Sequence, residues 1–165
     1  MTRMNTLSRR TVLTASAAAI SFSVAGCLGD GTDDWERDEP LPVTSATQYE
    51  GPGCDCCDVY ARYLQDHLDR ELEVMVTDDL TSIKEEYGIP ADLVSCHTVA
   101  LDGYVVEGHM PVAVIATLLR DEPDIEGIAL PGMPAGSPGM GGQKRETWTV
   151  YELRSDGEVA EYLEL

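Results

Sequence analysis

The sequence of 165 residues predicts a mixed α/β domain, and three observations support this fold class. Short β-prone segments alternate along the chain with segments whose apolar residues recur at helical spacing. Three cysteines stand where the first β-prone segment gives way to the first helical one. An Asp-Gly pair separates two further β-prone segments, as expected for the turn of a hairpin.

The first half of the domain is predicted to form two strands, each followed by a helix. Residues 43–49 are β-prone and lead through a Gly-Pro-Gly turn to the cysteines, and apolar residues over 57–68 then form a helical stripe. Residues 71–77 form the second predicted strand. Asp79 is a suitable cap for the second helix, which Gly88 ends.

The second half is predicted to begin with a hairpin over residues 98–107. A third helix starts at Pro111, where a proline is well tolerated. A loop rich in Gly, Pro and Met follows over 130–142, and residues 147–163 form a C-terminal β-hairpin. The order β-α-β-α-β-β-α, with cysteines at the first strand-to-helix turn, is the thioredoxin-like arrangement.

Residues 1–26 are predicted to be an export signal and not part of the fold. Arg9 and Arg10 precede a short apolar run that ends in Val-Ala-Gly-Cys, which is typical of a twin-arginine lipoprotein signal peptide. Cys27 then becomes the lipidated first residue of the mature chain. The alternative is an uncleaved membrane anchor, which is less favoured because the apolar run is short and rich in serine. Either way, the domain is expected outside the cytoplasm, anchored to the outer face of the cell membrane.

Residues 27–40 are predicted to carry the lipid and form an acidic flexible tether, and residues 41–165 form one domain of ordinary size. The formal net charge of the whole chain is -19. So acidic a surface argues against nucleic acid and anionic lipid as partners. Because acidic residues are spread along the whole chain, we interpret the charge mainly as that of a halophilic protein. The alternative is an electrostatic field that attracts cations, but salt would screen such a field.

The remaining cysteines are Cys54, Cys56, Cys57 and Cys96. They are compatible with a metal site, a redox dithiol or two structural disulfides. Their clustering favours the metal site, because crowded cysteines are poor staples and a helix start favours thiolate over thiol. Soft thiolates suit Cu(I), and four of them exceed what one two-coordinate ion needs, which allows a multinuclear cluster. Zinc is less favoured, since its four-cysteine sites usually pair two C-x2-C knuckles.

Four motifs occur in order along the domain. They are Cys-x-Cys-Cys at 54–57, Ser-Cys-His-Thr at 95–98, Gly-Tyr-Val-Val-Glu-Gly-His at 103–109 and the Pro/Gly/Met segment 131–140. Together they resemble the CopG-like copper-resistance family (domain of unknown function 411), over about residues 43–163. The resemblance implies an exported, thioredoxin-like protein that binds copper and is associated with copper tolerance. Asp55 replaces a Gly and Tyr60 a Trp of the family pattern, while all four thiols are kept.

Four further residues are candidate copper ligands. His97 directly follows a cysteine and His109 follows the predicted hairpin, so each is either a ligand or an ordinary hydrogen-bonded histidine. Met133 and Met140 lie in the Gly/Pro loop, where no helical stripe needs filling. Their thioethers suit Cu(I), and the alternative is a hydrophobic lid that closes over the cluster.

Two classes of function follow from these residues. The first, which we favour, is an extracytoplasmic, membrane-tethered protein that binds Cu(I) for copper tolerance or trafficking, with a copper exporter or a cuproprotein as a candidate partner. The second is a thiol or copper-dependent oxidoreductase, because Cys54 and Cys57 have C-x-x-C spacing. The extra thiols of Cys56 and Cys96 would form competing disulfides, so no catalytic residue is assigned.

Overall fold

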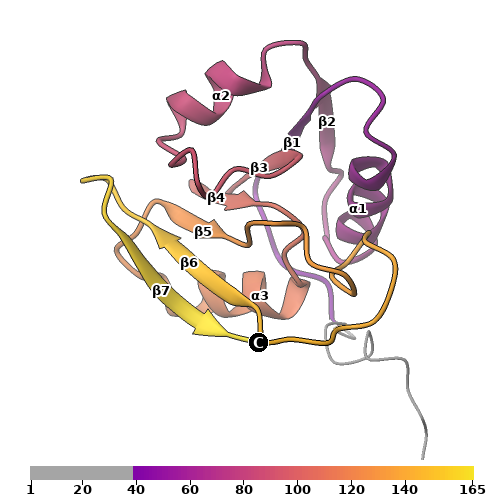
Figure 1. The fold of residues 1–165 in the computed structure, drawn as a ribbon. Coiled ribbons are helices and arrows are strands. Elements are labelled where there is room, and N and C mark those ends of the chain that lie inside the picture. The colour runs from indigo at the N-terminus through magenta and orange to yellow at the C-terminus, as the bar shows by residue number, and fades with distance from the viewer. Residues whose placement is uncertain (1–38) are drawn as a thin grey trace, which may run out of the picture.

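The computed structural model describes residues 39–165, so the predicted signal peptide, the lipidation site Cys27 and nearly all of the tether lie outside the described residues. None of the described helices is long and apolar enough to cross a membrane. The elements, in chain order, are β1 (Ala46–Glu50), α1 (Asp55–Asp66), β2 (Glu73–Val76), α2 (Leu80–Glu86), β3 (His97–Leu101), β4 (Tyr104–Glu107), α3 (Val112–Asp121), β5 (Gly127–Ala129), β6 (Thr149–Leu153) and β7 (Val159–Glu164) (Figure 1).

These strands form one seven-stranded sheet in the order β2-β1-β3-β4-β5-β6-β7. β1 pairs in parallel with β2, and β4 with β5, while the other neighbours are antiparallel. In the antiparallel pair of β1 and β3, Glu50 at the end of β1 lies opposite His97 at the start of β3. The segment that leaves β1 therefore lies beside the segment that enters β3.

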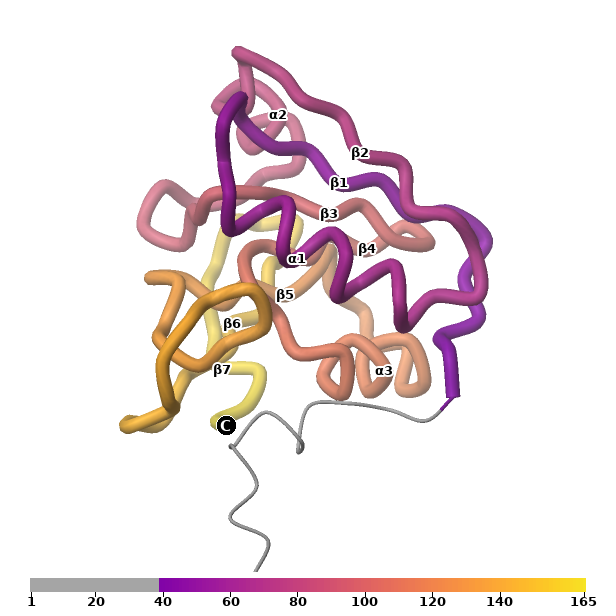
Figure 2. Tube along the Cα trace, turned by 90° about the vertical axis from the view of Figure 1, so that its right-hand side faces the viewer, coloured from indigo at the N-terminus to yellow at the C-terminus, as the bar shows by residue number. Residues whose placement is uncertain are grey.

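The sheet separates two apolar cores. α1 and α3 lie on one face of the sheet (Figure 2). Tyr60 and Leu64 of α1 and Ile115 of α3 are fully buried in the larger core. On the other face, Ile89 and Leu93, which follow α2, belong to the smaller core. Full burial of a Leu or Ile side chain contributes about 1.5–3 kcal/mol relative to its exposure. The helices are thus fixed to the sheet, and the start of α1 has a defined position.

The helices begin where local sequence favours them. Cys57, Tyr60 and Leu64 recur at spacings of three and four residues and form the buried face of α1. The first turn of α1 also carries acidic residues, which its N-terminal partial positive charge favours. The Asp79 side chain accepts a hydrogen bond from the N–H of Ser82 and caps α2, as the sequence predicts.

The predicted α/β class and the order of the first seven elements are confirmed, as is the C-terminal hairpin. The description as thioredoxin-like stays a prediction. Sequence reasoning missed β5, which has three residues and begins with a glycine. A Cβ on Gly127 would lie 2.0 Å from the carbonyl oxygen of Val105, so only glycine permits the two backbones to approach this closely. In a sequence, that glycine resembles a loop residue.

Candidate metal centre

The first turn of α1 carries three cysteines. Gly53 adopts the left-handed conformation, with φ of 72°, just before the helix. The carbonyl oxygen of Cys54 then accepts hydrogen bonds from the N–H groups of Cys57 (3.0 Å) and Asp58 (3.1 Å), which starts the helix at this point. Cys54 and Cys57 form a disulfide, and the thiol of Cys56 is free.

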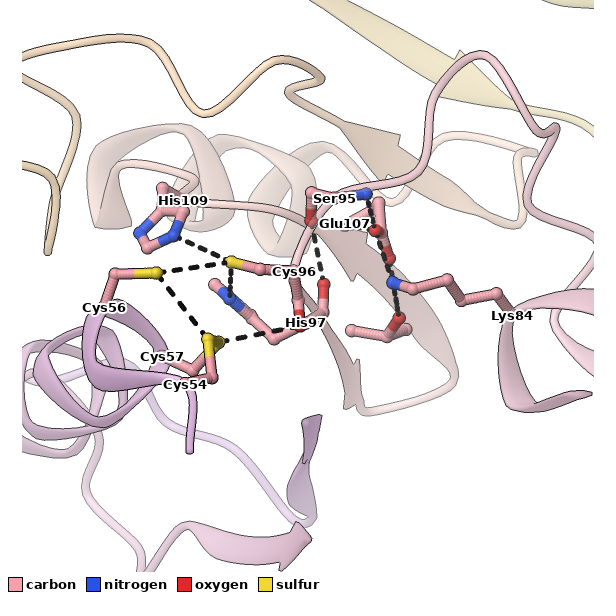
Figure 3. A network of polar contacts seen from close by, with 10 residues as sticks. Cys54, Cys56, Cys57, Lys84, Ser95, Cys96, His97, Glu107 and His109 are labelled. Carbon is pink, nitrogen blue, oxygen red and sulfur yellow. Dashed lines mark hydrogen bonds and ion pairs between the residues drawn. A yellow bond between two sulfur atoms is a disulfide. The ribbon is translucent and has the colours of Figure 1, made fainter. Parts of the chain in front are cut away.

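Cys96 reaches the same place from the segment that precedes β3. Its Sγ lies 3.7 Å from the Sγ of Cys56, which in turn lies 3.6 Å from the Sγ of Cys54 (Figure 3). The Sγ of Cys57 lies 3.6 Å from the carbonyl oxygen of Cys96. The four sulfur atoms all lie within 4.8 Å of one another. The structure thus brings together all four of the predicted cysteine ligands.

Both candidate histidine ligands are fully buried beside Cys96. The Sγ of Cys96 lies 3.1 Å from Nε2 of His109 and 3.4 Å from Nδ1 of His97. The ring of Tyr60 packs against both imidazoles, with its centroid 4.4 Å from that of His97 and 5.4 Å from that of His109. Cys96 therefore belongs to two overlapping groups of donors, one of four sulfurs and one of a thiol with two imidazoles. The remaining histidine, His67, contacts a main-chain carbonyl of α1 instead.

Burial keeps both imidazoles neutral. It lowers the pKa of His109 below its ordinary value. The pKa of His97 lies well below its ordinary value, first because of burial and then because of unfavourable electrostatic interactions of its protonated form with His109 and Lys84. Nδ1 of His109 donates a hydrogen bond to the carbonyl oxygen of Pro138 (2.7 Å), so Nε2 carries the lone pair that faces Cys96. Neutral imidazole is the form that binds metal ions.

The Nε2 atom of His97 is a second nitrogen at the site that could bind a metal ion. It is buried and has no hydrogen-bond partner among the residues that the structure describes. An unpaired buried nitrogen is unfavourable, because it has lost its hydrogen bonds to water. A bound cation at this atom would remove that penalty.

The thiol of Cys96 holds its proton strongly. Burial is the main cause, followed by its hydrogen bond with Cys56 and the charge of Cys56, and together they raise the pKa of Cys96 to about 12. The thiol is therefore neutral at physiological pH. A soft cation that binds here has to displace this proton, so its binding releases a proton to solvent.

The Gly/Pro/Met loop covers part of the site. Its Pro138 carbonyl binds His109, and a Cβ on Gly139 would lie 3.1 Å from the carbonyl oxygen of Cys56. Met133 is 37% exposed and Met140 is half-buried. The loop is thus a cover over the first turn of α1, whereas the roles of the two thioethers stay predictions.

Sequence reasoning missed two buried polar pairs that support the site. Nζ of Lys84 and Oε1 of Glu107 form an ion pair at 2.6 Å. Gln48 donates hydrogen bonds to Oε2 of Glu50 (2.6 Å) and to the carbonyl oxygen of Cys57 (3.1 Å), and burial raises the pKa of Glu50. The sequence feature that could have identified such a buried group is a charged residue next to an apolar run, as Glu107 is in Tyr-Val-Val-Glu.

The donor set fits a soft cation. In the disulfide-bonded form it offers the thiols of Cys56 and Cys96 together with two neutral imidazoles. Reduction of the Cys54–Cys57 bond would add two sulfurs, which the predicted four-thiolate site requires. Thiolate and imidazole together suit copper better than a hard, oxygen-preferring ion. The fold and this site define an α/β protein with a cluster of cysteines and histidines that could hold a metal ion.

Comparisons with known proteins place this protein in a family. A family model described as "Protein of unknown function, DUF411" matches residues 93–140. Two solved structures, "Copper resistance protein copG- Form 2" and "Copper resistance protein copG- Form 1", are each 34% identical to it, with TM-scores of 0.66. Each alignment covers 77% of this chain and 99% or 98% of the other. A comparison with curated proteins found no match. The chain belongs to the CopG-like copper-resistance family.

Proposed function

We propose that this protein binds copper as Cu(I) and serves copper tolerance or trafficking. The observation that carries the proposal is that four cysteine sulfurs lie within 4.8 Å of one another, and that one of them, Cys96, belongs to a second group with two buried imidazoles. The family supports copper as the metal, since the similar solved structures are named copper resistance proteins. Thiolates are the ligands that Cu(I) prefers, and neutral imidazoles complete its coordination without adding charge.

The number of donors supports more than one copper ion per chain. Cu(I) needs as few as two thiolates, and the reduced site offers four within 4.8 Å of one another. Thiolates so close together repel one another, and bridging cations would relieve that repulsion. We therefore propose a small thiolate cluster, to which Cys96 contributes as the residue shared by both groups of donors.

A copper titration tests this proposal. Reduced protein, handled without oxygen, is titrated with Cu(I) against a competing chelator. We expect more than one Cu(I) per chain for the natural sequence and loss of tight binding when Cys54, Cys56, Cys57 and Cys96 are all changed to Ser. His67→Ala serves as the control, because His67 lies outside both groups of donors. Equal copper uptake by the four-serine variant would disprove the proposed site.

A thiol or copper-dependent oxidoreductase is the second candidate function, and the Cys54–Cys57 disulfide favours it. A C-x-x-C disulfide next to two free thiols has the components for thiol exchange. However, the pKa of about 12 makes Cys96 a poor attacking group at neutral pH. We expect the metal-free protein to reduce insulin slowly. Thioredoxin-like rates without copper would favour the oxidoreductase over the binding protein.

We propose that the protein acts outside the cytoplasm, tethered to the cell membrane. The support is the twin-arginine pattern at Arg9 and Arg10 and the lipidation pattern at Cys27. Changing both arginines to Lys should block export, and Cys27→Ala should prevent lipid attachment. Cell fractionation decides the matter, and natural protein found soluble in the cytoplasm would contradict it.

A further inference from the structure

Behind the metal centre lies a buried polar cluster around one carboxylate. Glu107 is completely buried at the end of β4, and its Oε1 accepts hydrogen bonds from Nζ of Lys84 (2.6 Å) and from Oγ and the N–H of Ser95. Its Oε2 accepts a hydrogen bond from Oγ1 of Thr98 (2.6 Å), which also accepts one from Lys84 (2.8 Å). Figure 3 shows this cluster next to the cysteines.

The contacts of Glu107 lie on both sides of two metal-site residues. Ser95 directly precedes Cys96, and Thr98 directly follows His97. One carboxylate therefore fixes both ends of the two-residue segment that presents Cys96 and His97 to the first turn of α1. The hydroxyl of Ser95 also lies 3.1 Å from the carbonyl oxygen of His97, which closes the segment into a tight turn.

We propose that Glu107, paired with Lys84, is a positioning residue that holds Cys96 and His97 in place for metal binding. The effect of this positioning on copper binding rests on the function proposed above. A buried ion pair is a weak source of stability, because removing both charges from water offsets most of their attraction. Three of the four hydrogen bonds that Glu107 accepts come from Ser95 and Thr98, which flank the Cys96–His97 segment, and the orientation of that segment explains them better.

The neighbouring backbone supports the same role. Gly108 separates Glu107 from His109, so one short segment contacts both the Ser95 turn and the Cys96 thiol. A Cβ at Gly108 would lie 2.5 Å from the carbonyl oxygen of Leu130 and 3.2 Å from Oγ of Ser95. Gly108 therefore allows a close packing in which a small movement of the carboxylate also moves the metal ligands.

Lys84 has a separate part in this arrangement. It is 7% exposed and lies on α2, away from the four cysteines in sequence. Its charge pairs with the buried carboxylate, so that neither charge is left unpaired in the interior. The pair thus positions the segment without leaving a net charge behind the site.

The first test measures the position of Cys96 without any metal. Full-length protein with its Cys54–Cys57 disulfide intact is treated with dibromobimane, which bridges two thiols that lie close together, and the Cys56–Cys96 bridge is quantified by mass spectrometry. We expect the bridging rate to fall several-fold in Glu107→Gln. Asp121→Asn, which breaks an exposed ion pair on α3, removes the same charge and should leave the rate unchanged.

The second test measures copper affinity in the reduced variants. Loss of a residue that orients metal ligands typically costs about 10- to 100-fold in affinity, and we expect this for Glu107→Gln. Ser95→Ala keeps the buried ion pair and should lose less copper affinity. It replaces Glu107→Gln as the test variant if Glu107→Gln does not fold. Folded variants with the bridging rate and copper affinity of the natural protein would overturn the inference. Slower bridging in the variants, together with a natural protein that binds no copper, would keep the inference and refute the proposed function.

Discussion

Cys96 is the residue at which the two groups of donors meet. Its sulfur lies 3.7 Å from that of Cys56 on one side and 3.1 Å from Nε2 of His109 on the other. The lone pair on Nε2 of His109 faces this sulfur, so a cation that displaces the thiol proton can contact both atoms. The chemistry of the site therefore depends on when this thiol loses its proton.

The alkylation of Cys96 should show an unusual pH dependence. An ordinary cysteine thiol has a pKa of about 9, whereas that of Cys96 is raised to about 12, first by burial and then by Cys56. Because the thiolate is the reactive form, the rate in the folded, metal-free protein should keep rising between pH 9 and pH 11, where an unfolded control levels off. Site-specific iodoacetamide labelling measures this, and a plateau below pH 9 would contradict the raised pKa.

The same pKa difference affects folding stability. The folded protein binds the Cys96 proton more tightly than the unfolded chain does. The resulting stabilisation is complete below about pH 9 and is lost as the pH rises toward about 12. In the proposed copper-bound form the metal replaces this proton, and the dependence on pH should disappear.

At this scale the sequence predicted the types of donor but not their geometry. The four cysteines, His97 and His109 were recognised from their spacing and motifs, and the structure brings them together. The pairing of Cys54 with Cys57 was left among several alternatives, because spacing alone does not exclude the other pairs. Glu107 was missed, since its role depends on partners that the fold brings from other elements.

At the scale of elements, the Gly/Pro/Met loop is fixed to the helix that it covers. Gly139 has a φ of 80°, and a Cβ on it would lie 3.0 Å from the main-chain nitrogen of Tyr60 and 3.1 Å from the carbonyl oxygen of Cys56. The loop backbone therefore packs directly on the start of α1. Glycine at this position is required both by the backbone conformation and by the contact.

Gly139→Ala should destabilise the protein by about 1–3 kcal/mol, because the new methyl group meets main-chain atoms in a strained conformation. Copper retention should weaken as well, since the cover moves away from the site. Gly141→Ala is the matched control, because a Cβ at that position would have nothing within 4 Å of it, and it should change stability by less than about 0.5 kcal/mol. Chemical denaturation measures both, and equal values would refute the packing argument.

Long elements with clear patterns were predictable, and β5 was not. α1 and the hairpin of β3 and β4 carry strong local signals, namely a buried stripe and an Asp-Gly turn. β5 has three residues, which is too short to show a periodicity. It forms because β4 and β6 on either side supply its hydrogen bonds, and that information is not local in the sequence.

At the scale of the whole molecule, charge is the dominant property. A net charge of -19 on 165 residues means that acidic side chains repel one another over much of the surface. Arg120–Asp121 and Arg154–Glu152 are single ion pairs at the surface of the described structure, and such pairs offset little of this repulsion. We therefore expect that salt in the surrounding medium screens this repulsion and stabilises the fold.

The thermal unfolding midpoint should rise as KCl is increased from about 0.1 M to about 2 M, because the screening length falls from about 10 Å to less than about 3 Å. A variant with four exposed glutamates changed to Gln, at Glu71, Glu73, Glu85 and Glu86, should show a weaker dependence on salt. The same measurement in sucrose serves as a control, because this uncharged solute stabilises proteins by exclusion from their surface and does not screen charges. A midpoint that does not respond to KCl would contradict the prediction of a halophilic protein.

The hydrogen bond from His109 to Pro138 is made to a main-chain carbonyl, and this has a consequence for how the sequence can vary. Every amino acid supplies the same acceptor, so a substitution at position 138 leaves the His109 tautomer unchanged if the loop keeps its path. A deletion between Gly132 and Gly139 would move that carbonyl and release the imidazole to turn. The tautomer of His109 thus depends on the path of the loop backbone and not on the identity of the side chain at position 138.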